Sequence, residues 1–286
     1  MPPPPLGANT WIWVSPLTDA ALDTLAPKIA TWGFDLIELP VETPGDWHPA
    51  RTAALLAEQG LRVGVCAVMA PGRDLTTSDQ AIIEATRDYL RHCVEVAATV
   101  GAKVVGGPIY APTGVAMVLE PDERRVAVDR VATGLAPLLD EARAAGVTLA
   151  LEPLNRYETS LFNTVSQALE LVELLNHPAL GLLLDTFHLN IEERDLPTAI
   201  RTAGHRLAHV HACANDRGAP GRDHLDWPGI RAALADIDYR GALTIESFSS
   251  GNRSIATAAS IWRPLARTQD EIATEGLQFL RDLFTS

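Results

Sequence analysis

Val147-Thr148-Leu149-Ala150-Leu151-Glu152 is a short apolar run that ends on an ionisable side chain. Three later runs repeat this pattern and stop at Asp185, His211 and Glu246. Because burying an unpaired charge is unfavourable, four buried strands would not end this way independently. A shared divalent cation removes that penalty. The four runs therefore predict one site, assembled where successive parallel strands end at the mouth of a barrel.

Around these runs, β-rich segments alternate with longer segments of helical periodicity. We expect the first four strands at residues 9–14, 35–39, 62–68 and 103–106, and helices at 18–32, 78–100, 123–145 and 252–284. Glycine at 33, 60, 101 and 146 would end helices in the left-handed conformation. The alternation predicts an α/β fold, a (β/α)8 TIM barrel in a single domain at 7–286, after an extended leader at 1–6.

Length and composition support a globular protein of this class. A chain of 286 residues accommodates such a barrel, and 47% hydrophobic with 21% charged residues is typical of a soluble domain. The formal net charge of −13 disfavours nucleic acid as a partner. The sequence contains neither a membrane-spanning run nor the pattern of a signal peptide. Three isolated cysteines indicate a reducing, cytoplasmic location.

The donor set at the four strand ends indicates which metal it would take. Three carboxylates and one imidazole suit Mn²⁺, Mg²⁺ or Co²⁺ better than a structural zinc site. His188 lies three residues beyond Asp185, where it could reach a substrate hydroxyl. His209 shares the inward strand face with His211, one layer below it, and would either support His211 or be a core residue.

Several neighbouring polar residues have two interpretations. Glu158 could face the substrate or pair with Arg156, and Arg217 could bind sugar oxygens or remain a solvated loop residue. His224 and Asp226 could orient ligands or begin a helix.

Five motifs together resemble a known enzyme group. They are Glu152-Pro-Leu-Asn, Asp185-Thr-Phe-His188, His209-Val-His211, Asn215-Asp-Arg217-Gly and Thr244-Ile-Glu246-Ser-Phe248. Trp11-Ile-Trp13 and Ser260-Ile-Trp262-Arg263 add to the likeness. The chain resembles the D-tagatose, D-psicose (allulose) and L-ribulose 3-epimerases, which are ketose 3-epimerases of the xylose-isomerase-like TIM-barrel superfamily.

The resemblance implies a role for each matching residue. One divalent ion, most often Mn²⁺, would be held by Glu152, Asp185, His211 and Glu246, and the two glutamates would be catalytic. The residues expected at the substrate are Glu158, His188, Arg217, Phe248, Cys66 and Trp13. The resemblance also implies a homodimer or homotetramer. Ala214, Arg222-Asp223 and the absence of tryptophan in 106–112 depart from the family pattern and leave the preferred ketose open.

The site chemistry implies a reaction. Two glutamates on opposite faces could remove and return the C3 proton of a free ketohexose or ketopentose through an enediolate, while the metal acts as Lewis acid. Three alternatives keep the metal site: an aldose–ketose isomerase, a hydroxypyruvate-type isomerase and an inosose dehydratase. An endonuclease IV-like enzyme would need more histidines after strands three and four, and a non-catalytic sugar-binding barrel would not need both glutamates.

Overall fold

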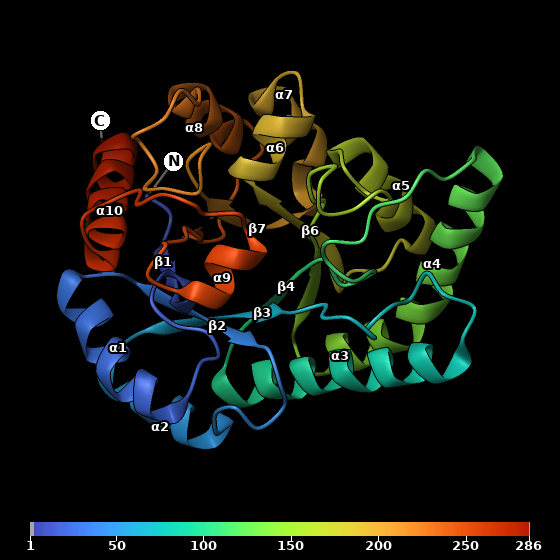
Figure 1. The fold of residues 1–286 in the computed structure, drawn as a ribbon, viewed down its shortest axis with the longest axis horizontal. Coiled ribbons are helices and arrows are strands. Elements are labelled where there is room, and N and C mark those ends of the chain that lie inside the picture. Colours follow the sequence, from blue (N-terminus) through green and yellow to red (C-terminus); the bar gives the residue numbers. More distant parts are fainter. Residues whose placement is uncertain (1–2, 286) are drawn as a thin grey trace.

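Eight parallel strands close into a barrel in the computed structural model, which describes residues 3–285 (Figure 1). Each strand pairs with its neighbours in chain order, and β8 closes the ring by pairing with β1. The strands are β1 (Leu6–Asn9), β2 (Leu36–Val41), β3 (Arg62–Ala67), β4 (Val104–Gly107), β5 (Thr148–Leu151), β6 (Leu180–Asp185), β7 (Leu207–Ala212) and β8 (Leu243–Ile245). The predicted (β/α)8 TIM barrel in one domain is confirmed.

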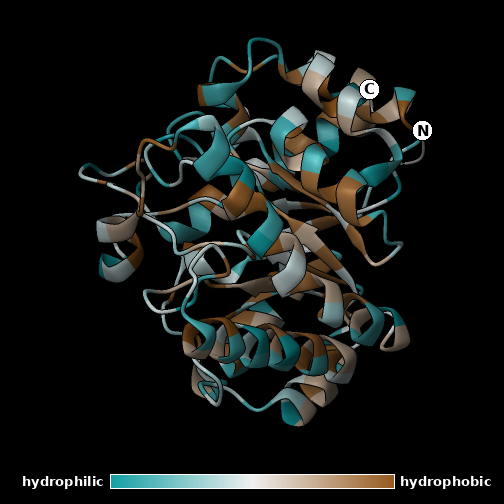
Figure 2. Ribbon diagram, turned by 90° about the vertical axis from the view of Figure 1, so that its right-hand side faces the viewer, coloured by the Kyte–Doolittle hydropathy of each residue, from teal (hydrophilic) through white to brown (hydrophobic). Residues whose placement is uncertain are grey.

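Helices surround the barrel and return the chain from the end of one strand to the start of the next. They are α1 (Asp19–Trp32), α2 (Pro49–Gln59), α3 (Gln80–Val100), α4 (Pro121–Ala144), α5 (Val165–Leu175), α7 (Leu196–Ala203), α8 (Trp227–Asp236) and α10 (Gln269–Thr285). Figure 2 shows apolar residues concentrated on the strands and polar residues on the outer helical surfaces. The apolar core thus fills the space between the two layers.

Short helical elements lie in the connections at the mouth of the barrel. A 3-10 turn, η1 (Thr10–Ile12), follows β1, α6 (Thr186–Glu192) follows β6 directly, and α9 (Arg253–Ala258) lies in the connection after β8. A second 3-10 turn, η2 (Gly204–Arg206), precedes β7 at the opposite end. Within 3–285, no helix is both long and apolar enough to cross a bilayer.

The predicted helix ends are confirmed where glycine was expected to stop them. Gly33, Gly60 and Gly101 are C-caps with φ of 85°, 69° and 78°. Gly146 follows the C-cap of α4 and also has a positive φ, 69°. Because L side chains rarely adopt this conformation, the glycines fix where each helix gives way to the following strand.

Three sequence-based boundaries were wrong. The first strand covers 6–9 rather than 9–14, because the Asn9 side chain accepts a hydrogen bond from the Trp11 amide and starts a turn. Leu6 pairs with Leu243, so the expected leader at 1–6 reaches into the barrel; residues 1–2 lie outside the described part. The expected helix at 252–284 is two helices, α9 and α10, separated by a segment that contains Pro264.

Candidate active site

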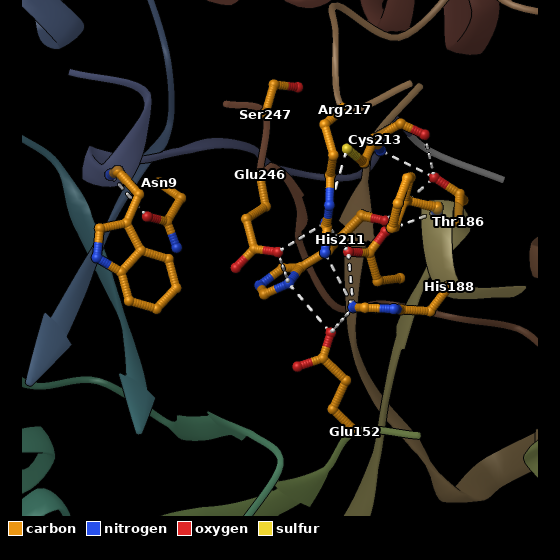
Figure 3. Close-up of polar contacts among 12 residues, drawn as sticks. Asn9, Glu152, Thr186, His188, His211, Cys213, Arg217, Glu246 and Ser247 are labelled. Carbon is orange, nitrogen blue, oxygen red and sulfur yellow. Dashed lines mark hydrogen bonds and ion pairs between the residues drawn. The ribbon is translucent and has the colours of Figure 1, made fainter. Parts of the chain in front are cut away.

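The four strand-end residues converge at the mouth of the barrel. Glu152 and Glu246 follow β5 and β8 directly. Asp185 is the last residue of β6 and His211 the last but one of β7, and the two are partners in the strand register. One ligand atom from each residue lies within 4.8 Å of the others, and all four side chains are buried. Figure 3 shows Glu152, Glu246, His188 and Arg217 approaching the His211 ring.

Two buried atoms in this cluster have no hydrogen-bond partner: Glu152 Oε1 and His211 Nδ1. His211 Nδ1 is 3.4 Å from Glu246 Oε2 and 3.9 Å from Glu152 Oε1. An unpaired buried acceptor is unfavourable, whereas a divalent cation placed among these atoms would satisfy them together. The oxygen-rich donor set with one imidazole fits Mn²⁺, Mg²⁺ or Co²⁺. The residues present therefore fit a divalent metal.

The electrostatics of the carboxylates differ within the cluster. Burial and the adjacent Glu246 raise the pKa of Glu152 well above its usual range. Burial also raises the pKa of Asp185, to about 6, against the opposing effect of Arg217. Burial raises the pKa of Glu246 too, but the His211 imidazole and Arg217 outweigh it and hold that pKa below its usual range. A cation beside these crowded carboxylates would offset their mutual repulsion.

Arg217 supplies part of that positive charge from the loop after β7. Its Nη1 donates to Asp185 Oδ2 at 2.5 Å and to Glu246 Oε2 at 3.2 Å. The guanidinium carbon lies 4.1 Å from the Phe187 ring centroid and 4.7 Å from that of Phe248. The backbone of Arg217 has a φ of 69°, and its carbonyl accepts from the Phe248 amide. Arg217 is buried and fixed, not a solvated loop residue.

His188, on α6, presents a hydrogen-bond donor to the same space. Its Nδ1 accepts from the Asn155 backbone amide at 3.1 Å, so Nε2 carries the proton in the neutral ring. Burial and the Arg217 charge hold the pKa of His188 well below its usual range, which keeps the ring neutral. Nε2 lies 3.0 Å from Arg217 Nη2, so two donors face each other. A substrate oxygen between them would accept from both.

Glu158 is held toward the same cavity by Asn155, whose side-chain amide donates to Glu158 Oε1 at 2.8 Å. The expected alternative partner, Arg156, instead forms an ion pair with Glu192. The cavity has a volume of about 180 Å³. Polar side chains line the cavity beside the four strand-end residues, and apolar side chains line the rest. The lining residues are Trp11, Ala67, Val68, Met69, Pro108, Thr113, Glu152, Leu154, Glu158, His188, Arg217, Glu246, Phe248, Ile255, Ala258 and Ala259.

Two residues expected at the substrate do not line this cavity. The Trp13 ring stacks on Trp32 and its Nε1 donates to Asp270, so Trp13 packs against the outer helices. Trp11, two residues earlier, lines the cavity because η1 interrupts the strand-like alternation. Cys66 is buried in β3, where its sulfur lies 3.4 Å from Asn9 Nδ2 and within 4.8 Å of ligand atoms of His211 and Glu246, so it borders the cluster without lining the cavity.

A wider groove lies between α4 and the loops after β3, β4 and β5. Its volume is about 630 Å³, and its apolar lining includes Val115, Met117 and Val126. None of the four strand-end residues and no histidine lines it. We therefore assign the chemistry to the smaller cavity.

One buried carboxylate beside the cluster was missed by sequence reasoning: Glu38, in the middle of β2. Its two carboxylate oxygens each lie 2.8 Å from an imidazole Nε2, one of His209 and one of His211. Burial raises the pKa of Glu38, but the His211 and His209 imidazoles hold it well below its usual range. An acidic residue inside an apolar strand was the available signal.

The remaining two candidates lie away from the cluster. Asp226 is the N-cap of α8 and accepts from the Gly229 amide, so the helix-start interpretation is correct for it. His224 is exposed, and its Nε2 lies 3.1 Å from Asn190 Oδ1.

Comparison with known proteins identifies similar chains along almost the whole sequence. The sequence profile of the family described as Xylose isomerase-like TIM barrel matches residues 26–283. A probable ketose 3-epimerase of Synechocystis sp. is 33% identical over 278 residues, which cover 97% of this chain and 96% of the relative. An L-ribulose 3-epimerase of Methylomonas sp. is 32% identical and covers 97% of both chains. The crystal structure of a D-allulose 3-epimerase from Methylomonas sp. with D-allulose has a TM-score of 0.91 at 31% identity, covering 99% of this chain and 98% of that one.

Proposed function

Because this chain belongs to the xylose isomerase-like TIM barrel family, with ketose 3-epimerases among its relatives, we propose that it is a metal-dependent ketose 3-epimerase. It inverts C3 of a free ketohexose or ketopentose of the D-tagatose, D-psicose (allulose), D-fructose or L-ribulose class. The observation that carries the proposal is the placement of Glu152 and Glu246 on one buried cluster beside a sugar-sized cavity.

The C3 proton of a ketose lies next to the C2 carbonyl, so its removal produces an enediolate. One glutamate removes this proton, and the other returns a proton to the opposite face of C3, which inverts the centre. Glu152 and Glu246 come from β5 and β8 and flank the cluster from different parts of the ring. The proton that leaves and the proton that returns balance, and no oxidant is needed.

A divalent ion held by Glu152, Asp185, His211 and Glu246 would supply positive charge that lowers the pKa of the C3 proton. His188 Nε2 and Arg217 Nη2 donate to the oxygen on which negative charge develops. Burial of the glutamates excludes water, which favours return of the proton to carbon over leakage to solvent. We propose Mn²⁺ as the resident ion, with Co²⁺ or Mg²⁺ as substitutes.

The proposed cellular setting follows from the state of the cysteines. Cys66, Cys93 and Cys213 are free and buried, which suits a reducing compartment, and we place the enzyme in the cytoplasm. We propose a homodimer or homotetramer that acts on a small sugar alone, without nucleic acid or membrane as partner.

The test is product identification. The metal-free protein is loaded with Mn²⁺ and incubated with D-fructose, D-tagatose or L-ribulose, with a chelator-treated sample as control. A 3-epimer as first product supports the proposal. An aldose would identify an aldose–ketose isomerase, and loss of water would identify a dehydratase. Unchanged melting temperature on adding Mn²⁺ would count against the metal site itself.

A further inference from the structure

Glu38 is a fully buried carboxylate inside the barrel, with 1% of its surface exposed. In the part of the chain that the structure describes, neither Lys nor Arg forms an ion pair with it. Its neighbours are the Asn9 amide, His209 and His211. Because an uncompensated buried carboxylate is unfavourable, this cluster requires the two imidazoles to face Glu38.

The contacts of Glu38 determine which nitrogen of His211 faces the metal cluster. Glu38 Oε2 lies 2.8 Å from His211 Nε2 and accepts from Asn9 Nδ2 at 2.9 Å. A carboxylate only accepts hydrogen bonds, so Nε2 must hold a proton. Nδ1 is then the nitrogen whose lone pair can bind a cation, and it is the atom that faces Glu152 and Glu246.

The residues next to Glu38 on the neighbouring strands leave room for its carboxylate. Asn9, Glu38 and Gly64 are neighbours across β1, β2 and β3. A Cβ on Gly64 would lie 3.0 Å from Glu38 Oε1, so the absence of a side chain there leaves room for the carboxylate. The second oxygen, Oε1, lies 2.8 Å from His209 Nε2, so each carboxylate oxygen has an imidazole beside it.

We propose that Glu38 is a positioning residue for the metal: it holds His211 with Nε2 protonated and Nδ1 aimed at the ion. The negative charge of Glu38 also makes the imidazole a stronger ligand for the metal. In arrangements of this kind, loss of the carboxylate typically weakens metal binding 10- to 100-fold. This role rests on the proposed metal site and is independent of which sugar reaction follows.

The experiment measures Mn²⁺ affinity by titration calorimetry for the parent and three variants. Glu38→Gln keeps the shape and can still accept from His211 Nε2, but it lacks the charge. Glu38→Ala removes both. Asp35→Asn is the matched control, because it removes one carboxylate just before the same strand, at the opposite end of the barrel.

A second readout separates positioning from a loss of charge alone. In the Co²⁺-loaded parent, proton NMR should show a strongly shifted, solvent-exchangeable signal from His211 Nε2–H. We expect Glu38→Gln to retain this signal with about tenfold weaker Mn²⁺ binding. Glu38→Ala should lose it through exchange and bind up to about 100-fold more weakly, and Asp35→Asn should match the parent.

Two results would overturn the proposal: affinities of both Glu38 variants within twofold of the parent, or no shifted exchangeable signal in the Co²⁺-loaded parent. The parent spectrum needs no variant, so misfolding of Glu38→Ala leaves the test intact. A parent that binds neither ion would overturn the metal site together with this role. A parent that binds Mn²⁺ but converts no ketose would remove only the proposed function.

Discussion

Arg217 Nη1 donates to Asp185 Oδ2 over 2.5 Å, which places a permanent positive charge against one of the carboxylates that we assign to the metal. The same nitrogen reaches Glu246 Oε2 at 3.2 Å. A divalent ion bound at this cluster would therefore compete with the arginine for the same negative charge. Unit charges about 4 Å apart near a protein surface interact by roughly 4 kcal/mol, so this competition is large enough to measure.

We predict that Arg217→Ala binds Mn²⁺ about three- to tenfold more tightly than the parent while losing most turnover. Mn²⁺ would bind more tightly because the repulsion between the guanidinium and the ion is removed. Turnover would fall because the Arg217 Nη2 donor beside His188 is removed. Arg217→Lys is the matched variant, because it keeps the charge but not the planar fork, and its affinity should stay near the parent value. Titration calorimetry measures both. Weaker Mn²⁺ binding by Arg217→Ala would show that the guanidinium supports the cluster instead of competing.

The neutral His188 donor gives a second prediction. His188→Asn should lower kcat/KM about 100-fold, since a donor to the developing negative charge is removed. Its Mn²⁺ affinity should remain within threefold, because His188 Nε2 is 3.9 Å from both Glu152 and Asp185. His205→Asn, in η2 at the far end of the barrel, is the control. Steady-state kinetics and calorimetry on the same samples decide the matter, and an equal loss of metal affinity would assign His188 to the ion.

The barrel and the convergence of its four strand ends could be predicted because both depend on local signals. Apolar runs, glycine stops and the shared direction of parallel strands place residues 152, 185, 211 and 246 at one end without any tertiary information. The metal role of these residues stays a prediction.

The sequence could not show which of Trp11 and Trp13 lines the cavity. Their alternation with Ile12 has the period of a strand, and only the capping contact between Asn9 and the Trp11 amide converts it into a 3-10 turn. The role of Glu38 was hidden for another reason. Its partners His209 and His211 are more than 170 residues away, and no local pattern connects them.

The last residue of β4 provides a stability prediction. Gly107 has a φ of 135°, and a Cβ there would lie 2.6 Å from the Ala67 carbonyl oxygen, which belongs to the adjacent strand and cannot move freely. Gly107→Ala should destabilise the protein by about 2–4 kcal/mol, combining strain and overlap. Gly72→Ala is the control, because its φ is 91° but no atom lies within 4 Å. Urea unfolding should show a loss of only about 1 kcal/mol for Gly72→Ala, and equal losses would remove the role of the Ala67 contact.

Cys93, buried on the inner face of α3, gives a prediction for alkaline pH. Burial raises the pKa of its thiol from 9.0 to about 12. As pH rises, the thiol ionises first in the unfolded protein. The free energy of unfolding therefore keeps its full value below pH 9 and falls between pH 9 and 12. Between pH 8 and pH 10 this thiol should cost the folded state about 1.4 kcal/mol. Urea unfolding of Cys93→Ala should show an alkaline loss smaller by that amount, despite lower stability at pH 7. Equal losses in the two proteins would exclude Cys93 as a cause.

The two-base mechanism is tested most directly with deuterium. Glu152→Gln and Glu246→Gln each keep an oxygen for the metal, so Mn²⁺ binding should persist while epimerisation falls about 1,000-fold or more. Each variant retains one glutamate, which still faces the C3 proton of one epimer. In D₂O, one variant should therefore exchange the C3 proton of the ketose, and the other variant that of its 3-epimer, without interconversion. NMR of the recovered sugars measures this. Activity within tenfold of the parent, or exchange of the same epimer by both variants, would contradict a pair of opposed bases, because each face of C3 can be reached from only one side of the cluster.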